Sequence, residues 1–334
     1  MQKPIVMAKR FNTTGNCIPG RHYMVSIDDK LEKIEDLINE GFYFTINRAR
    51  QFGKTTTMKM LLNRLQGDYV VYQISFETDG DMFSSQEDFC NGLFKKLSKA
   101  SYIGEDQKKF WGSDHNCKTF EDLSNVISEF CLSLNKPVVL MIDEVDKSTD
   151  NQLFLHFLGL LRNKYLDRTE CGMNSTFHTV ILAGVYDVKN LKLKIRSDEE
   201  RKYNSPWNVC ANESRASSLL GGYAECSQTS PYGNIAVRFN VDMTFSADGI
   251  KGMLDEYEAD YHTGMDTRMI ANEIRRLTSG YPVLVSYICS LIHEEFQGDW
   301  SIDGVNKAAK VIIKGDNTLA DDISNTALSF TPKI

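Results

Sequence analysis

Gly53, Lys54 and Thr55 could bind a phosphate group, because they follow an apolar segment over 42–46 and precede a helical pattern over 58–65. A loop between a strand and a helix offers free backbone N–H groups at the positive end of the helix, where an anion is stabilised. In such a loop the Lys54 ammonium would reach the β- and γ-phosphates, and the Thr55 hydroxyl would bind Mg²⁺.

Arg48 departs from the full phosphate-loop pattern, which has a glycine five residues before the glycine of Gly53-Lys54-Thr55. Without that glycine the start of the loop is not free to take positive φ, so its backbone must differ. Because Gly-Lys-Thr is common by chance, an ordinary strand-to-helix connection remains the alternative for this motif alone.

A second element ends on two acids. The run 137–142 is apolar and of strand length, and Asp143 and Glu144 follow it directly. Buried parallel strands end in this way where their carboxyl ends meet a ligand crevice. Asp143 would then hold Mg²⁺ and Glu144 would activate a water molecule. A solvated turn would explain the acids alone, but the two elements in this order together favour phosphate binding.

Hydrophobic periodicity predicts strands and helices in alternation. The expected strands begin near Phe42, Tyr69, Pro137 and His178, and the expected helices cover 28–40, 58–65, 86–102, 120–134 and 153–165. This order requires parallel strand pairing with right-handed crossovers. The predicted fold class is therefore α/β, a P-loop NTPase three-layer αβα parallel sheet followed by a small helical cap domain.

The domain organisation follows from changes in composition along the chain. After the αβα core, a stretch rich in Ser, Asn, Gly and charge is expected to be a loop or insertion, and four helical patterns over 250–261, 267–278, 283–296 and 304–313 are expected to form the cap. The predicted divisions are an N-terminal segment and leading helix (1–40), the ATPase core (41–196), the polar insertion (197–240), the helical cap (241–314) and a frayed tail (315–334).

Composition limits the possible partners. The 334 residues carry a formal net charge of −7, which gives no general affinity for nucleic acid or anionic membranes. No apolar run is long enough to span a bilayer, the start lacks the apolar stretch of a signal peptide, and the eight cysteines include no Cys-x-x-Cys pair. These features predict a cytoplasmic protein with reduced thiols and no membrane partner.

Several segments in a fixed order resemble a known family. The segment 11–25, the loop 48–56, the strand ending at Asp143-Glu144, and the motifs at 205–208 and 239–245 are similar to the AAA-like ATPase-domain proteins common in anaerobic bacteria. Gly280-Tyr281-Pro282 resembles the Gly-x-Pro signature of the STAND and archaeal-ATPase branch of P-loop NTPases. The resemblance implies an ATPase in which an arginine commonly stands at the position of Arg48, and it marks 213–238 as an insertion peculiar to this chain.

The expected site binds ATP and Mg²⁺. The candidate nucleotide-binding residues are Arg48, Arg50, Gln51, Phe52, Gly53, Lys54, Thr55 and Thr56; the candidate metal ligands are Thr55 and Asp143; the candidate catalytic residues are Lys54 and Glu144. Phosphoryl transfer depends mainly on positioning of the reactants and neutralisation of charge, and these residue types can supply both. Arg48 and Arg50 could add positive charge at the γ-phosphate, although an outward salt bridge is an alternative.

The sequence gives weaker indications of further residues that would contact the nucleotide. Tyr186 and Asp187 follow the fourth expected strand and could act as a sensor, with a simple turn as the alternative. Arg275 and Arg276 could provide a second sensor, although adjacent arginines on an amphipathic helix are typical of a solvated face. The resemblance alone suggests that the segment around 22–23, His22 and Tyr23, approaches the adenine.

Three functions remain open from sequence. The first is an ATPase that couples hydrolysis of ATP to ADP and phosphate with movement of the cap. The second is a nucleotide-dependent switch or scaffold with little hydrolysis. The third is a nucleic-acid-associated ATPase of a mobile-element or defence system, which the acidic net charge disfavours. A protein partner and the oligomeric state are left open.

Overall fold

The computed structural model describes residues 8–47, 52–76, 81–145, 152–171, 175–184, 236–238 and 242–315. The chain divides into two compact units. The first, here called the cap unit, consists of Met1–Asp28, Ala49–Thr56 and Asp242–Ile334; the second, the sheet unit, consists of Asp29–Arg48 and Thr57–Val241.

In the described residues, the sheet unit is built on five parallel strands in the order β2-β3-β4-β1-β5. Their bounds are β1 Tyr43–Asn47, β2 Val70–Ser75, β3 Val138–Asp143, β4 Thr179–Gly184 and β5 Ala236–Arg238. Every residue of β3 and β4 is buried, as expected for central strands covered on both faces. The parallel pairing predicted from the order of elements is confirmed.

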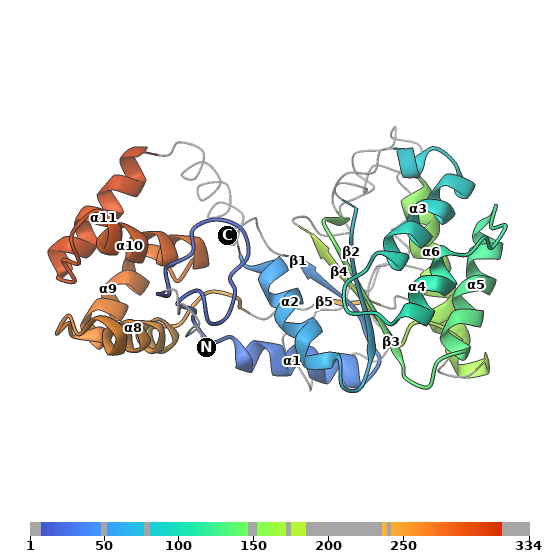
Figure 1. Cartoon of the computed structure of the whole chain (residues 1–334), viewed down its shortest axis with the longest axis horizontal. Coiled ribbons are helices and arrows are strands. Elements are labelled where there is room, and N and C mark those ends of the chain that lie inside the picture. The colour runs from blue at the N-terminus through green and yellow to red at the C-terminus, as the bar shows by residue number, and fades with distance from the viewer. Residues whose placement is uncertain are drawn as a thin grey trace, which may run out of the picture. The chain divides into compact units, whose positions relative to one another are not determined.

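Helices cover both faces of this sheet (Figure 1). On one side lie α1 Asp28–Asn39 and α2 Lys54–Leu65; on the other lie α3 Gln86–Ser98, α4 Glu105–Gly112, α5 Phe120–Leu132 and α6 Gln152–Cys171. The apolar stripes expected from sequence face the sheet, and large aromatic side chains such as Phe89, Phe130 and Phe157 fill the core beneath α3, α5 and α6. The three-layer αβα fold class is confirmed.

Two elements differ from the sequence expectation. The helix expected over 86–102 ends at Ser98, and the short helix α4 follows it. Helix α4 buries only Trp111, whose indole Nε1 donates to the Tyr72 hydroxyl at 3.0 Å, so it shows no periodic stripe. Strand β5 lies within the range assigned to the polar insertion, and it pairs with β1 at the edge of the sheet.

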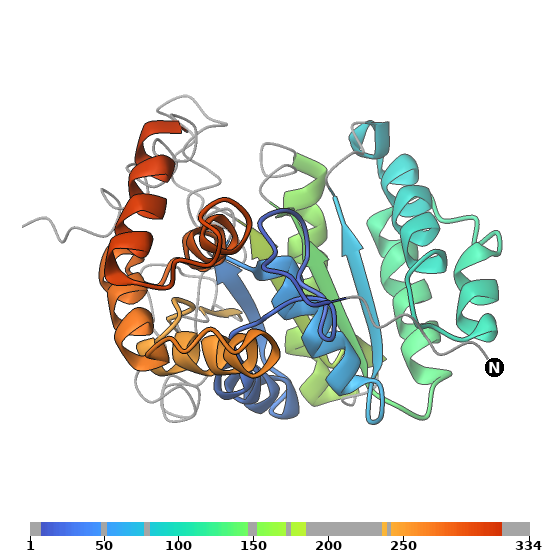
Figure 2. The same cartoon turned by 60° about the vertical axis from the view of Figure 1, so that its left-hand side comes forward.

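Four helices form the cap, as the periodicity predicted (Figure 2). They are α8 Ala247–Tyr261, α9 Thr267–Thr278, α10 Pro282–Glu294 and α11 Ile302–Gly315. The side chains of Ser246 and Asp266 cap the starts of α8 and α9 by accepting backbone N–H groups.

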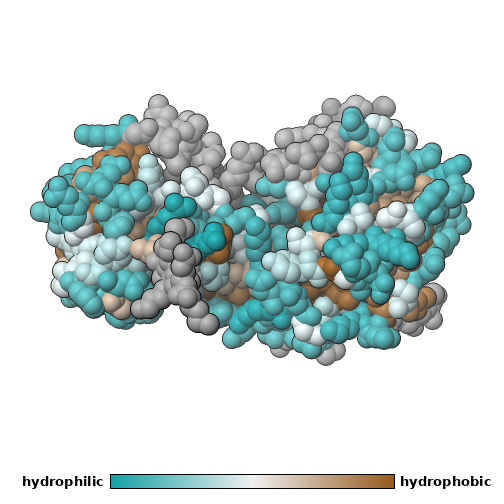
Figure 3. Space-filling model, viewed as in Figure 1, coloured by the Kyte–Doolittle hydropathy of each residue, from teal (hydrophilic) through white to brown (hydrophobic). Residues whose placement is uncertain are grey.

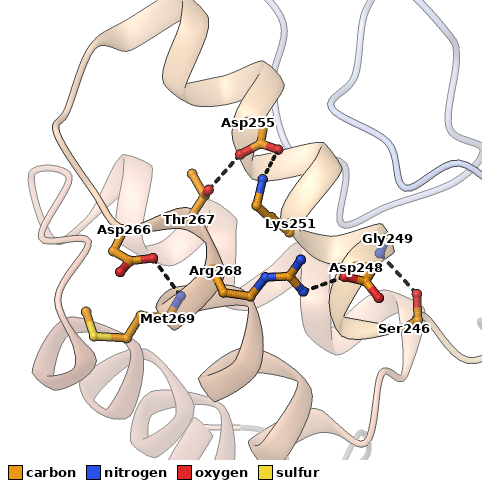
Figure 4. A network of polar contacts seen from close by, with 9 residues as sticks. All are labelled: Ser246, Asp248, Gly249, Lys251, Asp255, Asp266, Thr267, Arg268 and Met269. Atoms are coloured by element: carbon orange, nitrogen blue, oxygen red, sulfur yellow. Dashed lines mark hydrogen bonds and ion pairs between the residues drawn. The ribbon is translucent and has the colours of Figure 1, made fainter.

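Polar contacts on the surface connect α8 with α9 (Figure 4). Asp255 accepts from the Thr267 hydroxyl at 2.6 Å and pairs with Lys251 at 2.5 Å, while Arg268 pairs with Asp248. Exposed pairs of this kind each contribute about 0–1 kcal/mol. The apolar core of the four helices therefore supplies most of the stability of the cap.

The N-terminal segment packs into the core of the cap unit. The Phe11 ring lies 5.0 Å from Tyr23, 5.2 Å from Tyr257 and 6.0 Å from Trp300, measured between ring centroids. All four side chains are buried. Residues up to Asp28 form one compact unit with the cap helices.

The described surface is largely hydrophilic on the face shown in Figure 3, with apolar side chains gathered only in small areas. Within the described residues, none of the helices has the length and apolar character needed to cross a membrane.

Candidate nucleotide-binding site

The start of α2 has the features of an anion site. Gly53 adopts a left-handed backbone with φ +74°, and α2 begins at the next residue, Lys54. The first turn contains no acidic side chain that would compete with an anion for the N–H groups and the helix dipole. Lys54, Thr55 and Thr56 are half-buried, and Phe52 is buried. The other candidate residues of the loop, Arg48, Arg50 and Gln51, lie outside the described residues.

The two strand-end acids have distinct environments. Asp143 is the last residue of β3 and is 5% exposed, and its carboxylate Oδ1 accepts the Glu144 N–H at 2.9 Å. Glu144 is half-buried and has φ +56°, a left-handed conformation that costs a residue with a Cβ about 1–2 kcal/mol. The Asp143 carboxylate is thus held against the Glu144 N–H, and Glu144 has an unfavourable backbone conformation, as is common at functional sites.

A cation lies at the same edge of the sheet. Ser75, at the end of β2, is the register partner of Asp143, and the Ser75 carbonyl accepts from the Lys96 ammonium at 2.6 Å. The Phe76 N–H in turn donates to the Asp143 carbonyl at 3.3 Å. Lys96 thus anchors α3 to the strand next to β3.

The carboxyl ends of β1 and β3 lie at one edge, with β4 between them. Parallel strands are about 4.8 Å apart, so the ends of β1 and β3 are separated by about 10 Å. Strand β4 ends in Gly184, which has no side chain to fill this interval. Strand β1 leads directly into the connection that ends at Lys54, so the phosphate-loop sequence leaves the sheet at the edge where Asp143 ends β3.

Two contacts tie residues of this loop to other parts of the cap unit. The Phe52 ring packs edge-to-face against Tyr281, with centroids 4.5 Å apart and an interplanar angle of 77°. The Thr56 hydroxyl accepts the Cys17 N–H at 3.3 Å. Neither contact could be predicted from the sequence, because the two partners are far apart along the chain.

The candidate sensor arginines differ from each other. Arg276 is 64% exposed in its side chain and pairs with Glu273 at 2.7 Å, which confirms a solvated position. Arg275 is half-buried, and its Nε lies 3.1 Å from the position that a Cβ on Gly280 would take. In the described part of the chain Arg275 makes no ion pair. Tyr186 and Asp187 lie outside the described residues.

His22 and Tyr23 have structural roles in the cap unit. The ring Nδ1 of His22 accepts the Ile18 N–H at 2.9 Å, and burial together with Arg10 and Arg21 lowers the pKa of His22. The Tyr23 hydroxyl donates to Asp260 at 2.7 Å, and its ring is 2% exposed in the aromatic core. Tyr23 could contact an adenine only by leaving that core.

A parallel αβα sheet, with a Gly-Lys-Thr helix start after β1 and an Asp-Glu pair at the end of β3, defines the P-loop NTPase class. The sequence profile of a family described as AAA-like domain matches residues 21–191. The chain belongs to this family. A search of curated protein sequences found no significant match.

A solved ATPase structure shows a similar fold, and two further matches are weaker. The Walker-type ATPase PABY2304 of Pyrococcus abyssi superposes with a TM-score of 0.51 at 12% identity, over 92% of this chain and 77% of that one. Cdc6p of Pyrobaculum aerophilum gives a TM-score of 0.40 at 14% identity, over 99% and 73% of the two chains. The ORC1 protein of Aeropyrum pernix, solved in complex with DNA, gives 0.42 at 12% identity, over 85% and 65%.

Proposed function

We propose that this protein binds ATP together with Mg²⁺ and hydrolyses it to ADP and phosphate, and that hydrolysis is coupled to movement of the cap. The observation that carries the proposal is the order of elements at one edge of the sheet. Strand β1 leads into Gly53 and the start of α2, and β3 ends on the buried Asp143 at that same edge. Membership of the AAA-like domain family supports it.

The residues fit a magnesium nucleotide by their chemistry. The backbone N–H groups at the start of α2 and the Lys54 ammonium would supply positive charge for the phosphates. A carboxylate and a hydroxyl, those of Asp143 and Thr55, are oxygen ligands that Mg²⁺ accepts. Bound Mg²⁺ would neutralise charge on the phosphate oxygens. The Glu144 carboxylate would orient the attacking water and take its proton.

Removal of the Lys54 ammonium tests nucleotide binding. We expect Lys54→Ala to weaken ATP binding by about 10–100-fold, because a charge-assisted contact with a phosphate contributes about 1.5–3 kcal/mol. A titration followed by calorimetry measures the Kd. Lys59→Ala is the matched control, since Lys59 is exposed on the same helix and its loss should leave the Kd unchanged. Equal affinity of Lys54→Ala and the wild type would refute the proposed site.

Arg275, rather than Arg276, is proposed to add positive charge near the nucleotide. Arg275 lies beside Gly280, which precedes Tyr281, the partner of Phe52 in the loop. We expect Arg275→Ala to lower turnover by about tenfold or more, as expected for one lost charged contact. The neighbouring Arg276→Ala should have little effect, because Arg276 is exposed and paired with Glu273. Phosphate release assays compare the two variants, and equal effects would reject this assignment.

A nucleotide-dependent switch with little hydrolysis is the second candidate. The contact between Phe52 and Tyr281 favours it, because a link between the loop and the cap would respond to binding alone. Steady release of phosphate from the purified wild type at saturating ATP would exclude the switch, whereas tight binding without release would support it. Stimulation of hydrolysis by DNA or RNA at low salt would instead indicate a nucleic-acid-associated ATPase.

A further inference from the structure

The aromatic pair of Phe52 and Tyr281 is the buried contact from which the inference starts. The two side chains are 7% and 9% exposed, and the edge of one ring faces the other at 4.5 Å. Aromatic rings prefer this arrangement because the positive edge of one attracts the negative face of the other. The attraction depends on ring orientation, so a rotation of either ring changes the contact.

The position of the Phe52 ring depends on the conformation of the loop. Phe52 directly precedes Gly53, whose φ of +74° sets the direction in which the chain turns into α2. The N–H groups from Phe52 to Thr56 are those proposed to bind phosphates. Reorientation of these N–H groups toward an anion rotates the peptide planes on either side of the Phe52 Cα, and the ring must move with them.

The position of the Tyr281 ring depends on the cap. Tyr281 directly precedes α10, and its backbone is held on both sides. Its N–H donates to the Thr278 carbonyl at 3.0 Å, and its own carbonyl accepts the Val285 N–H at 3.0 Å. Gly280, with φ +73°, accepts the Phe245 N–H at 2.8 Å. A movement of the Tyr281 ring that reaches its backbone would therefore act on the first turn of α10, because the Tyr281 carbonyl accepts the Val285 N–H.

A second link supports the coupling of the loop to the cap. The Thr56 hydroxyl accepts the Cys17 N–H, and the segment that contains Cys17 is anchored in the aromatic core of the cap unit through Phe11 and Tyr23. Phe52 stands just before α2, and Thr56 lies in its first turn. Both residues are thus held by other parts of the cap unit.

We propose that the Phe52–Tyr281 ring pair transmits the nucleotide state of the phosphate loop to helix α10, with Tyr281 acting as a positioning residue. The proposal rests on the proposed binding of ATP and names the residues through which the cap senses it. A ligand shifts a conformational equilibrium only through contacts that differ between two states, and the proposal makes this ring pair such a contact.

Hydrogen exchange of the α10 amides tests the proposal. Exchange is measured from Val285 onward, with and without a saturating β,γ-imido analogue of ATP and Mg²⁺. We expect the analogue to slow exchange in the wild type, and we expect Tyr281→Leu to reduce this response by about fivefold or more. Tyr281→Phe keeps the ring and should respond as the wild type does. Tyr261→Leu, which removes a cap tyrosine that is 39% exposed, should also keep the response.

The outcomes separate this proposal from nucleotide binding itself, which an independent titration of each variant measures. Binding of the analogue without any change in α10 of the wild type would overturn the coupling and leave ATP binding intact. An undiminished response in Tyr281→Leu would also overturn it. Phe52→Leu changes the other ring and should lose the response in the same way, so it decides the question if Tyr281→Leu does not fold. Absence of binding to the wild type would refute both proposals.

Discussion

Glu144→Gln is expected to lower ATP turnover by about 10²–10⁴-fold, the range that a positioned general base contributes. Glutamine has the size of glutamate and makes the same demand on the left-handed backbone at φ +56°, so the fold should be unchanged. The amide cannot take a proton from water, whereas Lys54 and the start of α2 still bind the phosphates. Phosphate release gives the rate, and a titration should show an ATP affinity close to that of the wild type.

The matched control for this experiment is Glu87→Gln on α3, where the carboxylate is exposed and lies in the first turn of the helix. Its turnover should equal that of the wild type. Turnover of Glu144→Gln at the wild-type rate would exclude Glu144 as the base. A joint loss of binding and turnover would show that Glu144 acts in binding instead of in the chemical step.

Gly280→Ala is expected to destabilise the cap unit by about 2–4 kcal/mol, because a left-handed backbone and a steric clash act together. A Cβ at this position would lie 2.2 Å from the Phe245 carbonyl oxygen and 2.9 Å from the Phe245 nitrogen. Both atoms are backbone atoms, and Phe245 N–H also donates to the Gly280 carbonyl, so neither can give way without loss of that bond. Urea unfolding followed by circular dichroism measures the change in free energy.

Gly252→Ala is the control for the same chemical change. Gly252 lies within α8, and an added Cβ would meet no atom within 4 Å. Alanine in an open helical position stabilises by about 0.5–1 kcal/mol relative to glycine. The two substitutions should therefore shift stability in opposite directions. A Gly280→Ala protein as stable as the wild type would contradict the described path of the backbone at the start of α10.

Much of the fold could be predicted because burial leaves a local pattern. The apolar runs that become β3 and β4 are buried at every position, and the stripes of the cap helices follow the period of 3.6 residues. Strand β5 could not be predicted, because three residues, Ala236–Arg238, offer no alternation and become a strand only by pairing with β1. Helix α4 was missed since one buried side chain makes no stripe.

In the candidate site, too, some features could be predicted from the sequence and others could not. The residue types and spacing of Gly53, Lys54 and Thr55, followed by Asp143 and Glu144, indicated the chemistry, because a phosphate and a metal ion require particular groups at strand and helix ends. The left-handed conformation of Glu144 was not predictable, since a residue with a Cβ adopts it only where the surrounding structure imposes it.

Apart from β5 and α4, the sequence by itself determined the order of strands and helices, and with it the edge of the sheet at which the phosphate-loop motif and the acids are expected. Only the tertiary structure decided that the Phe52 ring meets Tyr281 and that the Thr56 hydroxyl accepts the Cys17 N–H. The physical reason is the range of the interactions. Periodicity, helix capping and the exposed pair of Arg276 with Glu273 act between near neighbours in the chain, whereas the first two contacts join distant segments and form only when the cap unit packs.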